Sequence, residues 1–388
     1  MKIIFFSHPL FLDHQSMPRY AQWLANGMKV RGHEVNIWSP KAKFVNLPLP
    51  AMFKKWLGYI DQFIVFPKWV KQQLKYQDNN TLYVFTDNAL GAWVPLIKSN
   101  KKVVHCHDFL AQKSALGELA EHSTSFTGKM YQKYIRNGYR HGLNFISISK
   151  KTKEDLHKFM DGYPINFSEV VYNGLTRDFK PLNVQACRKE LGEVLQSDLT
   201  TGYLLHVGGN QWNKNRKGVV EMYTSWRTLF SNTKIPLVLI GAEPDDILWE
   251  AYNTSGYKND ILIYTKASDE LVTKAYAGAT VFLFPSIAEG FGWPIVEAMA
   301  SGTPVITTNA APMTEVAGNA ATLVSLYSDE PKALEQWKKT SAMILNNLVN
   351  LPLNERESLV KTGIENAYRF DSDSVLDQME VVYKKIAG

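Results

Sequence analysis

One stretch of the chain, residues 289–304, constrains the fold more than any other. It reads EGFGWPIVEAMASGTP and lies between two short apolar segments, 279–286 and 305–308, which are typical of buried strands. Pro294 suits the first turn of a helix, where its missing N–H costs nothing, and Gly302 suits the position just past a helix end. The pattern therefore predicts a strand, a glycine-bearing loop, a short helix and a second strand.

Two carboxylates flank this turn: Glu289 lies on the loop, and Glu297 lies on the first turn of the predicted helix. Gly290 and Gly292 allow backbone N–H groups to approach a ligand closely, and a helix N-terminus favours phosphate. Glu297 can accept hydrogen bonds from both hydroxyls of a ribose, and Glu289 from those of a sugar. The arrangement suits a nucleotide-diphosphate sugar; the alternative is an ordinary turn with solvated glutamates.

These residues resemble the donor-site motif of the family-4 retaining glycosyltransferases, P-S-x-x-E-G-F-G-x-P-x-x-E-A-M-A-x-G-x-P-V, with agreement from Pro285 to Val305. Trp293 departs from the usual pattern, which has a smaller aliphatic residue there. The resemblance implies an α/β protein of GT-B fold, with two Rossmann-like domains whose parallel sheets face each other across a cleft. It also implies that the donor contacts Gly290, Phe291, Gly292, Trp293 and Glu297.

Length, hydropathy and cysteine content bound the class of protein. A chain of 388 residues is too long for one ordinary core and favours two α/β domains. Together with the resemblance, this predicts an acceptor-binding domain over 1–182, a nucleotide-sugar domain over 183–368, and a helix over 369–388 that returns to the first domain. No apolar run approaches the ~18 residues of a membrane span, and two cysteines are too few for a disulfide framework or a cysteine metal site. We therefore expect a cytoplasmic protein.

The net charge of +6 is unevenly spread along the chain. Residues 1–180 hold 25 Lys and Arg against 13 Asp and Glu, whereas the remainder holds 18 against 24. A basic half indicates an anionic partner, which could be nucleic acid, an anionic lipid or a phosphorylated acceptor. No nucleic-acid motif accompanies the charge, so the pattern favours lipid or phosphate and predicts no nucleic-acid partner.

The chain opens with a predicted strand at 2–7, a helix at 17–31 and a second strand at 32–37, which together make a Rossmann-like unit. This opening resembles the first βα unit of the family, including its R-G-H-E-V run. The family usually has a glycine pair in the loop after the first strand. The corresponding loop here, residues 8–18, contains no glycine.

A histidine candidate follows another predicted strand at 102–106. The pair His107-Asp108 resembles a His-Asp pair of the family, in which the histidine faces the sugar being transferred. His105 alternates to the same side of the strand and is the competing choice. The resemblance also suggests acceptor-binding residues in this half, which are His8, Asp108 and Asn173.

A glycine-bearing loop rich in cations, GGNQWNKNRKG at 208–218, follows a predicted strand at 202–207. Such a loop before a helix suits a diphosphate. In the family an Arg and a Lys of this loop neutralise the departing diphosphate, so we expect Arg216 in the first role, with Lys214 and Lys217 as alternatives for the second. A solvated basic loop is the plainer interpretation. The resemblance adds donor contacts at Gly209, Asn210, Tyr264 and Thr265.

Residues 51–76 place large apolar side chains at helical spacing, with lysines on other faces and Pro67 expected to interrupt the run. Such a segment can lie in a membrane interface, or it can pack on the N-terminal sheet. The lysines considered for a membrane contact are Lys54, Lys55, Lys68 and Lys71.

We therefore predict a retaining glycosyltransferase that moves a hexose from a UDP- or GDP-linked sugar to a glycan or lipid-linked acceptor, in surface polysaccharide synthesis. We expect no cofactor and no metal, and a position in the cytoplasm or at the inner face of the membrane. The catalytic candidates are His107, Glu289, Arg216, Lys217 and Lys214. The alternatives are an epimerase or phosphorylase of the same fold, and a non-catalytic sugar-binding subunit.

Overall fold

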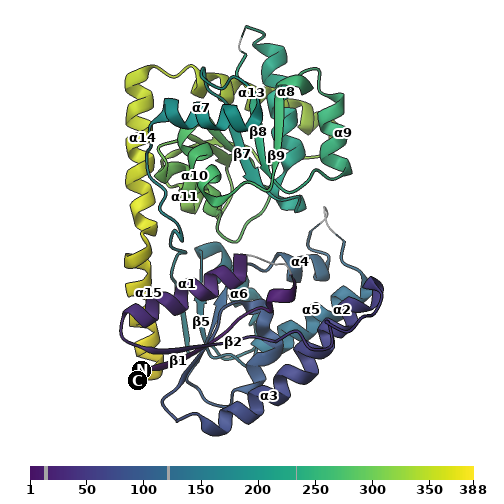
Figure 1. Ribbon diagram of the computed structural model, residues 1–388, viewed down its shortest axis with the longest axis vertical. Helices are drawn as coiled ribbons and strands as arrows, with labels where there is room; N and C mark the ends of the chain where they lie inside the picture. Colours follow the sequence, from purple (N-terminus) through teal and green to yellow (C-terminus); the bar gives the residue numbers. More distant parts are fainter. Residues whose placement is uncertain (13–15, 120–122, 233) are drawn as a thin grey trace. The chain divides into compact units, whose positions relative to one another are not determined.

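The computed structural model describes residues 1–12, 16–119, 123–232 and 234–388. It divides the chain into two compact units, Met1–Thr176 with Ser372–Gly388, and Arg177–Asp371 (Figure 1). The sequence placed these boundaries at 182/183 and 368/369. Residues 177–182 fall in the second unit, where Arg177 pairs with Asp269 at 2.7 Å and the ring of Phe179 lies 5.7 Å from that of Tyr276.

The first unit is built on a six-stranded parallel sheet with the order β2-β1-β3-β4-β5-β6. Its strands are β1 Lys2–Phe6, β2 Glu34–Trp38, β3 Leu82–Phe85, β4 Lys102–Cys106, β5 Asn144–Ser147 and β6 Phe167–Val170. The inner strands β3, β4 and β5 are buried along their whole length, as expected for parallel strands covered on both faces. The strands predicted at 2–7 and 102–106 are confirmed.

Helices flank this sheet. They are α1 Ser16–Val30, α4 Leu110–Leu116, α5 Phe126–Tyr139, α6 Lys150–Phe159 and α15 Ser372–Ala387, with short 3-10 turns η1 Leu10–Leu12 and η4 Asn88–Leu96. The predicted return of the C-terminal helix is confirmed, because α15 packs in the first unit. Gly27 of α1 makes this possible: a Cβ there would lie 2.5 Å from the side chain of Leu376.

Residues 51–76 form one continuous helical run, contrary to the predicted interruption at Pro67. The run comprises α2 Ala51–Ile60, a π turn η2 Asp61–Val65, α3 Phe66–Gln73 and a 3-10 turn η3 Leu74–Tyr76. Pro67 falls in the first turn of α3, just after the wider π turn. Because the run continues through it, Pro67 provides no backbone donor for the carbonyl of Gln62, which accepts instead from Trp93 Nε1 at 3.0 Å.

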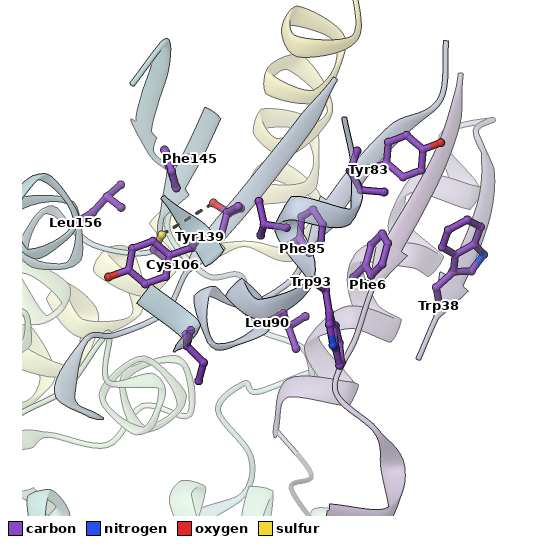
Figure 2. Packing of buried hydrophobic residues seen from close by; sticks show 14 of the residues in the cluster. Phe6, Trp38, Tyr83, Phe85, Leu90, Trp93, Cys106, Tyr139, Phe145 and Leu156 are labelled. Carbon is purple, nitrogen blue, oxygen red and sulfur yellow. Dashed lines mark hydrogen bonds between the residues drawn. The ribbon is translucent and has the colours of Figure 1, made fainter. Parts of the chain in front are cut away.

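A large apolar cluster fixes the strands of the first unit relative to their helices (Figure 2). Phe6 stacks on Phe85 with ring centroids 4.5 Å apart, and Phe66 of α3 meets Trp93 at 4.7 Å. Burying a side chain of this size is worth about 1.5–3 kcal/mol. The cluster holds the carboxyl ends of β1, β3 and β4 in register, and the polar residues described below follow those ends.

The second unit repeats the plan with a parallel sheet of order β12-β11-β10-β7-β8-β9. Its strands are β7 Leu204–Gly208, β8 Leu237–Gly241, β9 Ile261–Thr265, β10 Val281–Phe284, β11 Val305–Thr308 and β12 Ala321–Val324. Its helices are α7 Val184–Leu195, α8 Arg216–Leu229, α9 Asp246–Thr254, α10 Asp269–Gly278, α11 Trp293–Ala300, α12 Met313–Ala317, α13 Pro331–Val349 and α14 Leu353–Ala367, with 3-10 turns η5 Trp212–Lys214, η6 Lys258–Asp260 and η7 Tyr368–Phe370. The unit predicted around residues 289–304 is confirmed as β10, α11 and β11.

Within the residues that the structure describes, no helix has the length and apolar character needed to cross a bilayer.

Candidate functional site

The second sheet has a topological switch point between β7 and β10. From β7 the chain proceeds through β8 to β9 on one side, and β10, β11 and β12 follow on the other. At such a point the loops that leave neighbouring strands diverge, and ligands of open α/β sheets bind in the crevice at the strands' carboxyl ends. Here the two loops are those that lead from β7 to α8 and from β10 to α11.

Hydrogen bonds join these two loops directly. The carbonyl of Asn213 accepts from the hydroxyl of Ser286 at 2.6 Å and from the backbone N–H of Ile287 at 2.8 Å. In return, the amide group of Asn213 donates to the carbonyl of Ala288 at 2.7 Å. The loops are therefore fixed relative to one another by buried polar contacts, which is a requirement for a preorganised site.

Asn215 adds a further link and starts α8. It has a left-handed backbone (φ 53°), caps the helix by accepting from Gly218 N–H, and donates to the carbonyl of Pro285 at 2.9 Å. A Cβ on Gly218 would lie 2.5 Å from the Asn215 amide. Asparagine tolerates this backbone better than most residues, and glycine leaves the room that its side chain needs.

Lys214 and Glu289 meet across the switch point. Lys214 Nζ lies 2.8 Å from Glu289 Oε1 and 3.0 Å from Oε2, and Ser286 donates to Oε1 at 2.6 Å. The Glu289 side chain is only 8% exposed and that of Lys214 is 22% exposed. Charge-assisted bonds of this kind fix orientation well, so the pair presents an ammonium and a carboxylate at one defined place.

Glu297 lies on the second turn of α11, one turn later than predicted, because the helix starts at Trp293 with Gly292 as its N-cap. Gly292 has a φ of 103°, which favours glycine. Tyr276 donates its hydroxyl to Glu297 Oε2 at 2.9 Å. Burial raises the pKa of the Glu297 carboxyl, and the Tyr276 bond and the charges of Arg177 and Lys214 offset this only in part.

Arg216 is buried at the start of α8. Its Nη1 donates to the side chain of Asn210 and, at 2.9 Å, to the carbonyl of Ala242. Its Nε and Nη2 find no hydrogen-bond partner among the described residues. Burial lowers the pKa of Arg216, as expected when a charge is removed from water, and Asp245 opposes the effect.

The other alternative for the cationic role, Lys217, lies elsewhere. Its ammonium faces Asp329 at 3.3 Å and Glu221 at 3.9 Å. The structure therefore brings Lys214 to Glu289 and does not bring Lys217 there.

The predicted contacts beyond β8 form a second group. Thr265 donates to Glu243 at 3.0 Å, and the amide of Asn210 donates to the Glu243 carbonyl. Tyr264 precedes Thr265 at the end of β9, and Gly209 precedes Asn210 at the end of β7. These residues extend the same edge of the sheet away from α11.

Two residues that the sequence did not assign support this site. Tyr276 positions Glu297, and His206 lies buried in β7 with its Nδ1 bonded to the carbonyl of Leu283 at 2.9 Å. Burial lowers the pKa of His206 to about 3, so its ring is neutral beneath the cationic loop. Nothing local in the sequence marks either residue, since both act through partners on other strands or helices.

In the first unit, His107 follows β4. Its Nε2 bonds to the carbonyl of Thr86 at 2.9 Å, so this nitrogen carries the proton, and its backbone N–H donates to Asn88 at 3.0 Å. Burial lowers the pKa of His107, against the opposing effect of Asp87. The ring packs edge-on against Tyr20 with centroids 4.6 Å apart.

The competing choice, His105, is a core residue. Its two ring nitrogens bond to the hydroxyls of Tyr20 and Tyr383, at 2.9 and 2.8 Å. Burial lowers its pKa to about 3. His105 therefore connects α1, β4 and α15.

Of the acceptor candidates, His8 pairs with Asp87 at 2.9 Å, and Asp87 also caps η4 through the N–H of Ala89. Asp108 is exposed and caps the backbone N–H of Leu110. Asn173 is fully buried, and neither atom of its amide has a hydrogen-bond partner among the described residues. Asp87 was not predicted. Part of the glycine-free loop 8–18, residues 13–15, lies outside the described residues.

Two six-stranded parallel sheets with flanking helices define the GT-B fold, and the predicted fold class is confirmed. The structure of Anabaena HepE in complex with UDP-glucose matches with a TM-score of 0.69 at 16% identity, over 99% of this chain and 100% of that one. At that identity the likeness shows the fold alone.

Residues 188–363, within the second unit, match the family described as Glycosyl transferases group 1, which confirms the resemblance. O-antigen chain mannosyltransferase B of Escherichia coli is 30% identical over 185 residues, 47% of this chain and 46% of that protein. O-antigen chain mannosyltransferase RfbU of Salmonella typhimurium is 25% identical over 232 residues, 59% of this chain and 57% of that protein. The chain spans about half the length of these relatives.

Proposed function

We propose that this protein is a retaining glycosyltransferase that moves a mannosyl residue from a nucleotide-diphosphate sugar to a glycan or lipid-linked acceptor during synthesis of a surface polysaccharide. The printed names of its O-antigen relatives support mannose and polysaccharide synthesis. The observation that carries the proposal is the Lys214–Glu289 pair, held between two joined loops at the switch point of the second sheet.

In this proposal the donor lies along the edge of the second sheet. A diphosphate at the N-terminus of α11 would face Lys214 and the favourable end of the helix dipole. Glu289 would accept from hydroxyls of the sugar, and Glu297 would accept from the two hydroxyls of the ribose. Tyr264 and Thr265 would lie toward the nucleobase.

Arg216 would supply the second positive charge to the departing diphosphate. Its two nitrogens without partners, Nε and Nη2, cost free energy when buried, and an anion would offset this cost. Because Nε and Nη2 have almost no exposed surface, an anion would reach them through a shift of the Asn210 side chain. Preorganised cations that stabilise developing charge are a large source of catalysis.

His107 would act at the sugar as a neutral imidazole. Its protonated Nε2 is held by the Thr86 carbonyl, which fixes the orientation of the ring. This role rests on the resemblance of the His107-Asp108 pair. We assign no protein nucleophile.

A transfer assay tests the proposal. Purified protein is incubated with GDP-mannose or UDP-glucose, with and without acceptor, and products are identified by mass spectrometry and anomeric NMR. We expect release of GDP from GDP-mannose and an α-linked product from this α-linked donor, whereas release of UDP from UDP-glucose alone would contradict the assignment of mannose. Turnover should persist in EDTA, because lysine and arginine take the neutralising role. Dependence on inorganic phosphate would indicate a phosphorylase, and donor binding without turnover would indicate a sugar-binding subunit.

A further inference from the structure

Two segments of the first unit are almost free of negative charge. Residues 39–76 contain seven lysines and one carboxylate, Asp61, and residues 123–140 contain four lysines and arginines and no carboxylate. The first segment holds α2 and α3, and the second holds α5. Segments with so little compensating charge give a surface a strong positive potential.

The one carboxylate is not accessible to a ligand at the surface, because Asp61 is 1% exposed. Its two oxygens accept the backbone N–H groups of residues 43, 44 and 45, each at 3.0 Å. Lys54 is also committed to the fold: its ammonium donates to the carbonyls of Val45 and Leu47, both at 2.7 Å. The loop before α2 is thus tied down, and Lys54 is a structural residue.

Exposed apolar side chains lie among the remaining cations. On α2, Met52 is 75% exposed and Trp56 is 58% exposed. On α5, Phe126, Met130 and Tyr134 recur every four residues and are 76%, 59% and 50% exposed. Four-residue spacing places the three on one stripe of the helix, and that stripe does not pack into the core.

Aromatic contacts join the two helices into one surface. Tyr59 stacks on Tyr131 at 5.7 Å between centroids, and Phe63 packs against Tyr134 at 5.8 Å. Figure 1 shows α2 and α5 next to each other in the first unit. We define the α2–α5 face by Lys55, Trp56, Phe126, Lys129, Met130 and Lys133. Its three lysines are exposed and form no ion pair with any described residue.

We propose that the α2–α5 face docks this protein on an anionic lipid bilayer. Interfacial helices insert aromatic and aliphatic side chains at the level of the headgroups, while lysines beside them face anionic lipids. A second copy of the chain fits this face less well, because a two-fold interface would bring the same cations against each other. This inference does not depend on the proposed transfer reaction, since it concerns a different surface and a different ligand.

Vesicle flotation of the full chain tests the proposal. The vesicles are phosphatidylcholine alone, or phosphatidylcholine and phosphatidylglycerol in equal amounts. We expect the wild type to float with the anionic vesicles at low salt. It should not float with the neutral vesicles. It should also not float with the anionic vesicles in about 1 M NaCl, where the Debye length is about 3 Å. A wild type that is folded and never floats would overturn the proposal.

Two variants locate the contact. Lys55→Glu, Lys129→Glu and Lys133→Glu together should lower the apparent partition coefficient by more than about a hundredfold, since each lysine near an anionic surface contributes about fivefold. Trp56→Ser with Phe126→Ser should lower it by a comparable factor through lost apolar burial. All five positions are exposed, so melting temperatures should stay close to that of the wild type.

Matched controls carry the same three charge reversals, or the loss of two exposed apolar side chains, on the second unit. They are Lys258→Glu with Lys332→Glu and Lys339→Glu, and Ile247→Ser with Leu353→Ser, at exposed positions. Both controls should float like the wild type. If the controls lose flotation as strongly as the α2–α5 variants, the contact is not specific to this face and the proposal fails. If Trp56→Ser with Phe126→Ser instead dissociates a dimer in analytical ultracentrifugation and leaves flotation unchanged, the face is a contact between copies.

Discussion

Two carboxylates, one in each unit, have pKa values that are shifted in opposite directions. Burial alone would raise the pKa of Asp87, but the hydrogen bond and charge of His8, the charge of His107 and the N–H of Ala89 outweigh it, so its pKa is lowered. The pKa of Glu297 is raised by burial, because its direct partner is the neutral hydroxyl of Tyr276. Asp87 is therefore satisfied by the protein, whereas Glu297 would still gain from further donors, as the hydroxyls of a ribose would supply.

The same contrast extends to the surroundings. Around Asp87 the first unit places imidazoles and tyrosines that share hydrogen bonds, which suits recognition of neutral hydroxyls. Around Glu297 the second unit places the positive charges of Arg177 and Lys214, which suits an anion. The comparison indicates that, in the proposed reaction, the second unit stabilises the negative charge of the departing diphosphate.

The largest effect should come from removing a cation there. We expect Lys214→Ala to lower kcat about 10²- to 10³-fold, because a preorganised charge at the leaving group is lost. Lys217→Ala is the matched control and should change kcat less than about threefold, since it forms surface ion pairs of small worth. Steady-state assays at saturating donor measure both. Equal losses in the two variants would contradict the placement of Lys214.

The second effect concerns the ribose. Glu297→Ala should weaken nucleoside diphosphate binding about ten- to a hundredfold, since a hydrogen bond to a charged group is worth roughly 1.5–3 kcal/mol. Tyr276→Phe should weaken it by less than about tenfold, because it only positions Glu297. Isothermal titration calorimetry with the free nucleoside diphosphate gives both values. If Glu297→Ala binds the nucleoside diphosphate with wild-type affinity, Glu297 does not bind the ribose.

A smaller effect is expected in the first unit. His107→Ala should lower kcat about three- to tenfold, the worth of one neutral hydrogen bond, and leave nucleoside diphosphate affinity unchanged. Circular dichroism controls for folding, since His107 is buried. A change in nucleotide affinity together with an unchanged kcat would show that His107 does not act at the sugar.

The smallest effects are on stability against pH, and they should have opposite signs in the two units. The lowered pKa of Asp87 gives stability that is present above its unfolded value of about 3.9 and is lost as pH falls through the folded value. Asp87→Asn should therefore flatten the loss of melting temperature below about pH 4.

The raised pKa of Glu297 acts in the other direction. It gives stability that is present below the unfolded value of about 4.3 and is lost as pH rises through the folded value. Glu297→Gln should consequently gain melting temperature relative to the wild type between about pH 4 and about pH 7. Scanning calorimetry of both variants measures how the change in melting temperature depends on pH. If this change has the same pH dependence in the two variants, the two carboxylates do not differ as described.

Local patterns in the sequence were sufficient to predict the strands and the motif around Glu289, because glycine, proline and apolar runs act on their own neighbourhoods. They could not choose between Lys214 and Lys217, since the choice depends on how η5 and α8 turn each side chain. Tyr276 and Asp87 were missed for a similar reason. Asp87 meets a histidine 79 positions away, and only the folded sheet brings the two together.

The sequence also predicted half of the α2–α5 face and misjudged one of its lysines. Helical spacing identified the large apolar side chains of residues 51–76, but the exposed stripe on α5 was not predicted. Lys54 was interpreted as a surface cation, but its ammonium donates to two carbonyl groups of the loop that precedes α2. The exposed fraction of a side chain and its hydrogen bonds to the backbone decide these roles. The spacing of residues along the sequence predicts neither of them.

The measurement that tests the central claim most directly is a crystal structure of the full chain with the nucleotide sugar that binds. The account predicts the ribose hydroxyls within hydrogen-bond distance of Glu297 and the diphosphate within reach of Lys214 and Arg216, beside the N-terminus of α11. A nucleotide bound away from the β7–β10 switch point, or one whose diphosphate meets neither cation, would contradict it.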